Sequence, residues 1–218
     1  MPPEPLILGF DTSAAHCAAA LLCNGKTLAQ RHEEMNKGQA ERLMPLLEEL
    51  LAEAGARWRD ITAIGVGIGP GNFTGIRISV AAARGLALAL SRPAIGVSGF
   101  ESLAEGQNGP VLASIDARQD RLFVQRLNSS ATNAPFQTGL KNIPRALFDD
   151  AATCVGFRSE EIAAEFGAPA ASPCYPPAVA IVRIAESRYT RAHPRPAPLY
   201  IRPADAAPSR NPAPVILP

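Results

Sequence analysis

The sequence predicts an α/β protein of two lobes, each a mixed β-sheet flanked by helices. Short apolar, β-branched runs alternate along the chain with amphipathic stretches of helical period. The segment order in the first half, βββαβαβα, requires parallel as well as antiparallel strand pairs. Residues 111–116 then repeat a feature of residues 6–11, a buried strand with an aspartate at its carboxyl end. This repeat suggests an internal duplication.

The first half contains three strands and a helix, followed by further strands and helices. Asn24-Gly25 is a strong signal for a two-residue hairpin turn. Pro45 kinks the first helix or marks its true first turn, and Thr74 is the expected N-cap of the second. Ser98 and Glu101 have capping-box spacing, so another helix begins there. Predicted strands cover residues 6–10, 14–23, 27–33, 61–68 and 94–97, and predicted helices cover residues 39–54 and 75–90.

The second half is predicted to form a smaller lobe. We expect the first lobe over residues 1–105 and the second over residues 106–202. Residues 203–218 form a Pro/Ala-rich tail, which we expect to be disordered because proline denies it ladder and helix hydrogen bonds. Predicted strands cover residues 111–116, 121–127 and 153–157, and predicted helices cover residues 142–151, 159–166 and 178–191.

Composition argues against several classes of protein. The 218 residues are 47% hydrophobic with a net charge of +1, so no global field recruits nucleic acid or a membrane. The 18 arginines are dispersed, and RNA binding by this chain alone is not expected. Glu4 and Asp11 interrupt the first apolar run, no export signal precedes it, and no run reaches ~18 uninterrupted apolar residues. The four cysteines form no close pair. We therefore expect a cytoplasmic protein.

Two aspartates and a glycine loop are predicted to meet in one cleft. Ligands of two-lobed α/β proteins lie at the carboxyl ends of the strands, and glycine lets a backbone approach a ligand closely. One interpretation is a nucleotide phosphate cleft; the other is that the aspartates are ordinary turn residues at strand ends. The residues of this candidate cleft are Asp11, Thr12, Gly69, Gly71 and Asp116.

At this level the chain resembles the actin-like ATPase (ASKHA) superfamily. In that fold, two Asp-x-Gly loops hold phosphates and metal. This chain departs from the pattern at both places, because residues 11–13 read Asp-Thr-Ser and residues 116–118 read Asp-Ala-Arg. No glycine pair for an adenosine pocket is evident near Gly156.

Five motifs carry a more specific resemblance, to the TsaB (YeaZ) family. They are residues 8–13 (LGFDTS), 42–45 (RLMP), 67–77 (GIGPGNFTGIR), 113–118 (ASIDAR) and 198–202 (PLYIR). The resemblance covers roughly residues 6–202. It implies a non-catalytic activating partner of TsaD, the transferase that forms threonylcarbamoyladenosine in tRNA. It also implies that the ATPase TsaE joins the pair, that tRNA is bound only through the complex, and that the chain forms a homodimer without TsaD.

The residues argue against independent catalysis. TsaD holds its metal with a His-x-x-x-His pair, and the resemblance places Gly99 and Leu103 at those positions. His16, His32 and His193 do not have metal-ligand spacing, and no histidine is predicted near Ser13 or Ser98 to act as a base. We expect no metal and no tightly bound cofactor, with ATP or ADP at the interface with TsaD left open. The alternatives are a small-molecule kinase or ATPase of the same fold and an M22-type metallopeptidase.

Two apolar helices are predicted to form a docking face. The helices over residues 39–54 and 75–90 each have apolar residues around much of their circumference, and in the second the charged Arg77 and Arg84 share one stripe. We expect their apolar sides to pack on the same face of a paralogue, and the alternative is that both are enclosed in their own lobe. The expected contact residues are Arg42, Leu43, Leu46, Leu50, Gly75, Ile76, Ser79, Val80 and Ala83.

Overall fold

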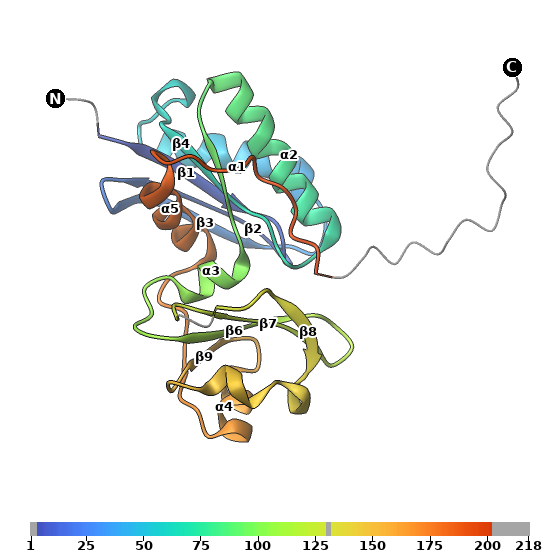
Figure 1. Ribbon diagram of the computed structural model, residues 1–218. Coiled ribbons are helices and arrows are strands. Elements are labelled where there is room, and N and C mark those ends of the chain that lie inside the picture. Colours follow the sequence, from blue (N-terminus) through green and yellow to red (C-terminus); the bar gives the residue numbers. More distant parts are fainter. Residues whose placement is uncertain (1–3, 130–131, 202–218) are drawn as a thin grey trace, which may run out of the picture.

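The computed structural model describes residues 4–129 and 132–201 and contains two five-stranded sheets, one in each lobe (Figure 1). The predicted tail lies outside these residues. In the first sheet the strand order is β3-β2-β1-β4-β5, and β1 pairs antiparallel with β2 and parallel with β4. The mixed sheet that the sequence predicted is thus confirmed. Its strands are β1 (Leu6–Asp11), β2 (His16–Cys23), β3 (Lys26–Glu34), β4 (Ala63–Gly67) and β5 (Ala94–Val97).

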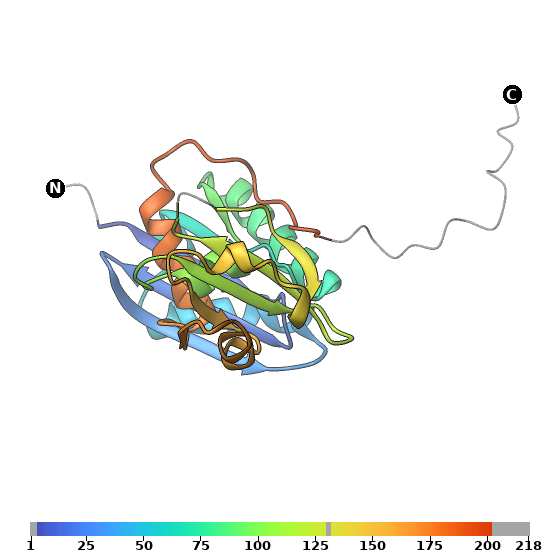
Figure 2. The same cartoon turned by 60° about the horizontal axis from the view of Figure 1, so that its bottom comes forward.

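The second sheet repeats this arrangement (Figure 2). Its order is β10-β9-β6-β7-β8, and its central strand β6 pairs antiparallel with β7 and parallel with β9. The pairing around each central strand is the same, as an internal duplication requires. The strands are β6 (Val111–Asp116), β7 (Arg121–Leu127), β8 (Phe136–Gly139), β9 (Thr153–Gly156) and β10 (Ala170–Ala171).

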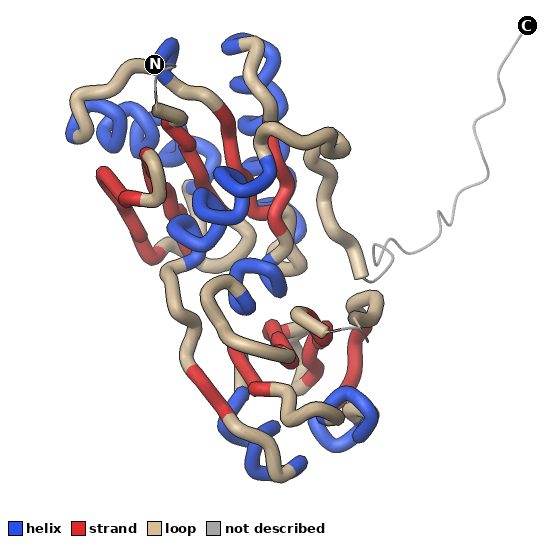
Figure 3. The backbone as a smooth tube through the Cα atoms, turned by 60° about the vertical axis from the view of Figure 1, so that its left-hand side comes forward, coloured by secondary structure: helices blue, strands red, loops and turns tan. Residues whose placement is uncertain are grey.

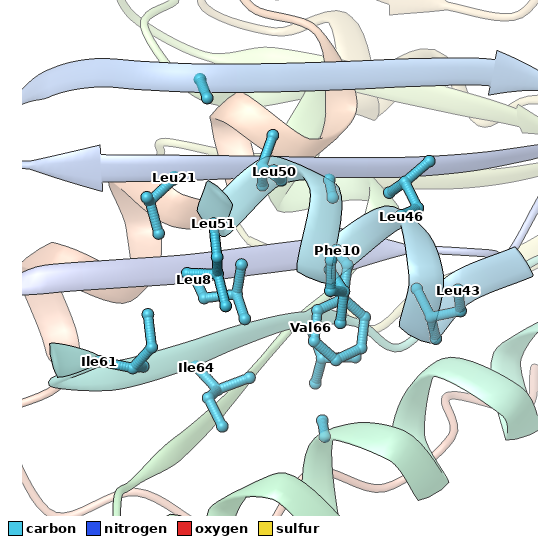
Figure 4. Packing of buried hydrophobic residues seen from close by; sticks show 14 of the residues in the cluster. Leu8, Phe10, Leu21, Leu43, Leu46, Leu50, Leu51, Ile61, Ile64 and Val66 are labelled. Carbon is cyan, nitrogen blue, oxygen red and sulfur yellow. The ribbon is translucent and has the colours of Figure 1, made fainter. Parts of the chain in front are cut away.

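Three helices enclose the first sheet. One face is covered by α1 (Gln39–Glu53) and α2 (Phe73–Leu90), and the other by α5 (Pro177–Arg188) (Figures 1 and 3). The leucines of α1 point onto the sheet, where they pack against Phe10 and its neighbours (Figure 4). Most of the hydrophobic core of this lobe therefore lies between the sheet and its helices.

The last helix of each lobe packs on the other lobe. Helix α3 (Gly99–Ala104) contacts β6, β7 and β9, whereas α5 contacts β1, β2, β4 and β5. Residues 106–202 were predicted to form the second lobe, and α5 is the correction to that boundary. Its close approach depends on glycine: a Cβ on Gly9 would overlap the side chain of Val182, and one on Gly65 would lie 2.8 Å from Ile181 Cγ2.

The chain after α5 runs back across the first lobe and along α2 (Figures 1 and 2). We call residues 190–201 the C-terminal strap. The backbone N–H of Leu199 donates to the carbonyl oxygen of Ile68 at 2.8 Å, and the Cα of Pro196 lies 3.6 Å from where a Cβ on Gly96 would be. The strap is therefore seated on the first lobe between β5 and the loop before α2.

One predicted helix is wrong. Residues 142–151 form no α-helix; instead η2 (Leu140–Asn142) and η3 (Arg145–Phe148) are short 3₁₀ turns, and the strand β8 before them was not predicted. Pro144 separates the two turns. The buried Arg126 donates from its guanidinium to the carbonyl oxygens of Ala146 and Asp149. These long-range hydrogen bonds pair carbonyl groups that the 3₁₀ turns leave free, including that of Ala146, which a helix would have paired internally.

Other helix starts need smaller corrections. Asn72, not Thr74, caps α2, because its Oδ1 accepts from the N–H groups of Thr74 at 3.0 Å and Gly75 at 3.1 Å. The predicted capping box of Ser98 and Glu101 is present at the start of α3. Helix α4 (Ser159–Phe166) has the predicted bounds, and η1 (Trp58–Asp60) precedes β4.

Candidate functional site

The cleft between the lobes receives three of the five predicted residues. Asp11, Gly69 and Asp116 line it, at the carboxyl ends of β1, β4 and β6. Thr12 and Gly71 do not line it. The cavity measures about 250 Å³, which is below the ~300–1,000 Å³ usual for small-molecule sites. The strand ends thus meet as predicted, around a small space.

Local partners occupy the carboxylate of Asp11, which is only 5% exposed. Its Oδ1 accepts from the N–H of Ser13 at 3.1 Å, and its Oδ2 accepts from the Ser13 hydroxyl at 2.9 Å. The same Oδ2 lies 2.8 Å from His16 Nε2, and the His16 ring packs at 4.8 Å against that of His32. Few lone pairs of this carboxylate remain for a metal or for metal-bound water.

His16 was not predicted to lie in the cleft, and the structure corrects this. No histidine was expected near Ser13, yet both side chains bind the same oxygen of Asp11. The arrangement is not that of a serine nucleophile, in which the histidine accepts the serine proton and the aspartate holds the histidine. Here the Ser13 hydroxyl donates to Asp11 instead. The signal was the polar turn after β1, which leads directly into the antiparallel strand that carries His16.

The glycines of the loop before α2 make room for the turn after β1. A Cβ on Gly71 would overlap the carbonyl oxygen of Ser13, and one on Gly75 would overlap that of Thr12. The Thr12 hydroxyl donates to the Gly75 carbonyl oxygen at 2.7 Å, and the Asn72 N–H donates to Ser13 O at 2.6 Å. The Asn72 side chain accepts hydrogen bonds from two further N–H groups at the start of the helix. The N-terminus of a helix attracts phosphate through its free N–H groups. Here the N–H groups of Asn72, Thr74 and Gly75 already donate hydrogen bonds within the chain. Thr12 and Gly71 therefore have a packing role.

The positions assigned to the metal histidines of TsaD also lie in the cleft. Gly99 and Leu103 both line it. Among the described residues, no group of three or more histidine, cysteine, aspartate and glutamate side chains is placed to hold a metal ion. Asp116 is exposed, and its Oδ1 accepts from the N–H of Arg118 at 2.8 Å. Within the described part of the chain the lining of the cleft contains no cluster of metal ligands, and its titratable side chains are those of Asp11, His16 and Asp116.

The predicted docking residues lie on the wrong face of their helices. They point into the first lobe, as Figure 4 shows for those on α1, because both helices are needed to cover one side of a five-stranded sheet. The helical period of apolar residues indicates which side of a helix is buried, but not whether its own chain or a partner chain buries it. The predicted contact residues that are buried in their own lobe are Leu43, Leu46, Leu50, Gly75, Ile76, Ser79, Val80 and Ala83.

Arg42, the remaining predicted contact residue, is partly buried and paired within its own lobe. Its Nη2 lies 2.6 Å from Glu33 Oε1 and 2.6 Å from Glu49 Oε2. These ion pairs join α1 to β3 and raise the pKa of the Arg42 guanidinium, chiefly through the hydrogen bond to Glu33. The guanidinium is therefore already neutralised by neighbouring carboxylates.

The opposite side of α2 faces solvent. We call Arg77, Ala81, Arg84, Gly85 and Leu88 the outer face of α2; their spacing puts them on one stripe, and each is exposed. The side chain of Leu88 is 84% exposed. With mean hydropathy 1.4 over 18 residues, α2 is long and apolar enough to cross a membrane by length and composition alone, although 28% of it is buried inside the protein. Arg77 and Arg84 interrupt this helix, so it is not a run of ~18 uninterrupted apolar residues.

Arg77, at the start of this face, binds other residues of the same chain. Its guanidinium lies 3.8 Å from the centre of the Phe73 ring, and its Nε donates to the Tyr200 hydroxyl at 3.1 Å. The rings of Phe73 and Tyr200 are 5.1 Å apart. This cluster joins the end of the C-terminal strap to the first turn of α2.

The two sheets and the exchanged helices place this chain in the actin-like class of α/β proteins. Component A of (R)-2-hydroxyglutaryl-CoA dehydratase from Acidaminococcus fermentans has the same fold, with a TM-score of 0.56, 9% identity, and 86% of this chain and 100% of that chain covered. YeaZ from Pseudomonas aeruginosa is more similar, with a TM-score of 0.72, 27% identity, and 90% of this chain and 99% of that one covered. The actin-like fold is therefore confirmed.

Sequence comparison defines the family. A model of the TsaD family, tRNA N6-adenosine threonylcarbamoyltransferase, matches residues 28–169. The tRNA threonylcarbamoyladenosine biosynthesis protein TsaB from Escherichia coli K12 is 38% identical over 122 residues, which are 54% of this chain and 52% of that protein. This match spans about half the length of that curated relative. The chain belongs to the TsaB (YeaZ) family, a group related to TsaD.

Proposed function

We propose that this protein is a non-catalytic activating partner of a TsaD-type transferase in the formation of threonylcarbamoyladenosine in tRNA. The observation that carries the proposal is the contrast between its two surfaces. The cleft at the strand ends is small and the carboxylate of Asp11 in it is engaged by Ser13 and His16, whereas the outer face of α2 exposes Leu88 to water. The relatives named for threonylcarbamoyladenosine biosynthesis connect this pair of surfaces to tRNA modification.

The cleft supports the non-catalytic part. A kinase or ATPase of this fold needs loops whose backbone N–H groups reach phosphate. In this chain those loops lack the glycine after the aspartate, and the start of α2 is capped by Asn72 and pressed against the turn after β1. A metallopeptidase needs ligands that the lining does not offer among the described residues. We therefore propose that the chain acts through association.

The outer face of α2 supports the association. The TsaD family model matches this chain, so a TsaD-type partner has a related lobe with an equivalent helix. Ala81 and Gly85 let such a helix approach closely, and burial of Leu88 contributes about 2 kcal/mol. Two copies of this chain would pair through the same face when the partner is missing. We infer that the outer face of α2 binds protein, in the cytoplasm, and that TsaE and tRNA join the assembled pair.

Two variants test the docking face in the complete chain. Leu88→Arg should abolish co-purification with TsaD and stimulation of tRNA modification by TsaD and TsaE. Leu28→Arg is the matched control, because Leu28 is an exposed leucine (42%) on β3, away from α2. It should retain both activities. Undiminished binding by Leu88→Arg would show that the outer face of α2 is not the docking site. Failure of the wild-type chain to stimulate tRNA modification would refute the proposed function.

A thermal-shift measurement with ATP and Mg²⁺ tests the alternative of an ATPase. Ligand that binds the native state must raise the unfolding temperature. We propose that the isolated chain binds no nucleotide tightly and shows no shift, and that any ATP or ADP site is completed at the interface with TsaD. A clear rise with the isolated chain would favour a kinase or ATPase.

A further inference from the structure

Helix α1 also has an outer side, and it carries charge of the opposite sign to that of α2. Both helices cover the same face of the first sheet. We call Glu41, Pro45, Glu48 and Ala52 the outer stripe of α1; each is exposed, and their spacing puts them on one side of the helix. The outer stripe of α1 is therefore acidic, whereas the two charged residues in the outer face of α2 are arginines.

The outer stripe of α1 and the outer face of α2 have the same spacing. In each, a charged residue is followed by a small or apolar residue after four positions, a second charged residue after three and another small or apolar residue after four. Two charges seven residues apart lie ~10.5 Å apart along a helix axis, so one alignment brings both charges of one helix to opposite charges on the other. The residues that face one another in this alignment are Glu41 and Arg77, Pro45 and Ala81, Glu48 and Arg84, and Ala52 and Leu88.

The direction of the two helices decides how two copies of the chain can use this match. Strands β3, β4 and β5 all run parallel to β1. Helices α1 and α2 each lead from one of these strands to the next, so they run in the same general direction. A two-fold axis along the helices stacks α1 of one copy on α2 of the other and keeps that direction. An axis across them stacks each helix on its own copy and opposes like charges, which repel.

We propose that a second copy of this chain binds the outer face of α2 with the outer stripe of its α1, and that this contact occurs twice in the symmetric pair. The pairing uses the docking face of the proposed function, on which it rests, and adds the contribution of α1. Two helices ~25 Å long and ~10 Å wide cover roughly 500 Å² a side, less than the ~800 Å² usual in stable complexes. The pair should therefore be weak and dissociate when a TsaD-type partner occupies the same face.

Sedimentation velocity of the complete chain without TsaD measures the pairing. The wild type should form dimers with a dissociation constant of ~1–100 μM at about 50 mM salt, and the constant should rise severalfold at ~500 mM because exposed charges are screened. Glu48→Arg and Arg84→Glu should each weaken the dimer about tenfold, because each turns two attractive pairs into two repulsive pairs. Glu165→Arg is the matched control, since Glu165 is an exposed glutamate on α4 of the second lobe. It should dimerise within about twofold of the wild type.

A mixture of the two single variants tests whether the charges meet between copies. A heterodimer of one Glu48→Arg copy and one Arg84→Glu copy has opposite charges at both contacts. The equimolar mixture should therefore dimerise as tightly as the wild type, although neither variant does so alone. The double variant Glu48→Arg/Arg84→Glu should recover the dimer for the same reason. Thermal unfolding verifies that each variant is folded, and recovery in the mixture shows it independently.

Four outcomes would overturn the proposal. They are a chain that stays monomeric at ~1 mM, a single variant that dimerises as tightly as the wild type or more tightly, a mixture that fails to recover the dimer, and a dimer that TsaD leaves intact. The last would mean that the copies pair through another surface. The result is separable from the proposed function: a chain that stimulates TsaD without dimerising loses only the pairing of copies, and one that dimerises without stimulating TsaD loses the proposed function.

Discussion

Replacing Leu46 by alanine tests whether this side chain stabilises the first lobe, as its burial indicates, or contacts a partner protein, as the helical period predicted. Leu46 was predicted to contact a partner, yet it is 0% exposed and packs with Phe10 and Leu43 in the first lobe (Figure 4). Leu88 on α2 is its counterpart, because it is 84% exposed. A stability effect is therefore expected at Leu46 and a binding effect at Leu88.

The expected magnitude follows from the burial. Leu46→Ala removes three buried carbons, which at ~0.8 kcal/mol each is about 2.4 kcal/mol of transfer free energy. The cavity left behind raises the cost to about 3–4 kcal/mol. For a protein of this size the unfolding temperature should fall by roughly 10 °C. Leu88→Arg places its charge in water and should change the free energy of unfolding by less than ~0.5 kcal/mol.

Calorimetry of both variants, together with co-purification with TsaD, separates the two roles. Leu46→Ala should lose stability and, below its unfolding temperature, still bind. The reasoning would be refuted by a variant of Leu46 that unfolds within about 2 °C of the wild type and yet fails to bind, because that side chain would then face the partner.

Three other predictions concern the same packing, and a fourth concerns the second lobe. Gly75→Ala should lower the free energy of unfolding by about 1–3 kcal/mol, because its Cβ would overlap a backbone oxygen of the β1–β2 turn. Gly85→Ala, which meets no atom, should raise it by up to ~1 kcal/mol in urea titrations. Burial raises the pKa of the Cys17 thiol to about 11, so at about pH 8 only ~0.1% is thiolate and a disulfide reagent should label exposed Cys174 long before Cys17. Arg126→Ala should cost about 2–4 kcal/mol by urea unfolding, since the carbonyl oxygens around η3 lose their donor.

Local signals predicted most of the fold. The strands over residues 94–97, 111–116 and 121–127 and the helix over residues 159–166 have the predicted bounds. These segments combine a clear period with polar residues, prolines or glycines at their ends. The helix over residues 142–151 failed because its conformation depends on a buried arginine from another strand. No local pattern carries that information.

The candidate site was predictable in position and less so in its interactions. The ends of parallel strands must meet, so Asp11, Gly69 and Asp116 were placed together correctly. The hydrogen bond between Asp11 and His16 depends on how the turn after β1 folds back, and the cluster of Arg77, Phe73 and Tyr200 depends on where the strap meets α2. Such interactions between distant segments are set by tertiary packing, which a local sequence pattern does not report.

The cleft and the outer face of α2 are linked by one junction. The turn after β1 presses on the start of α2, where Thr12 donates to the Gly75 carbonyl oxygen and Asn72 donates to Ser13. This junction occupies the place where a phosphate would meet the helix, and it also fixes the rotation of α2 about its axis. With Ile76 and its neighbours held inward, Leu88 must point outward. A rigid helix presented in this way loses little entropy on binding, so the junction that engages the donors at the start of α2 also preorganises the surface proposed for docking.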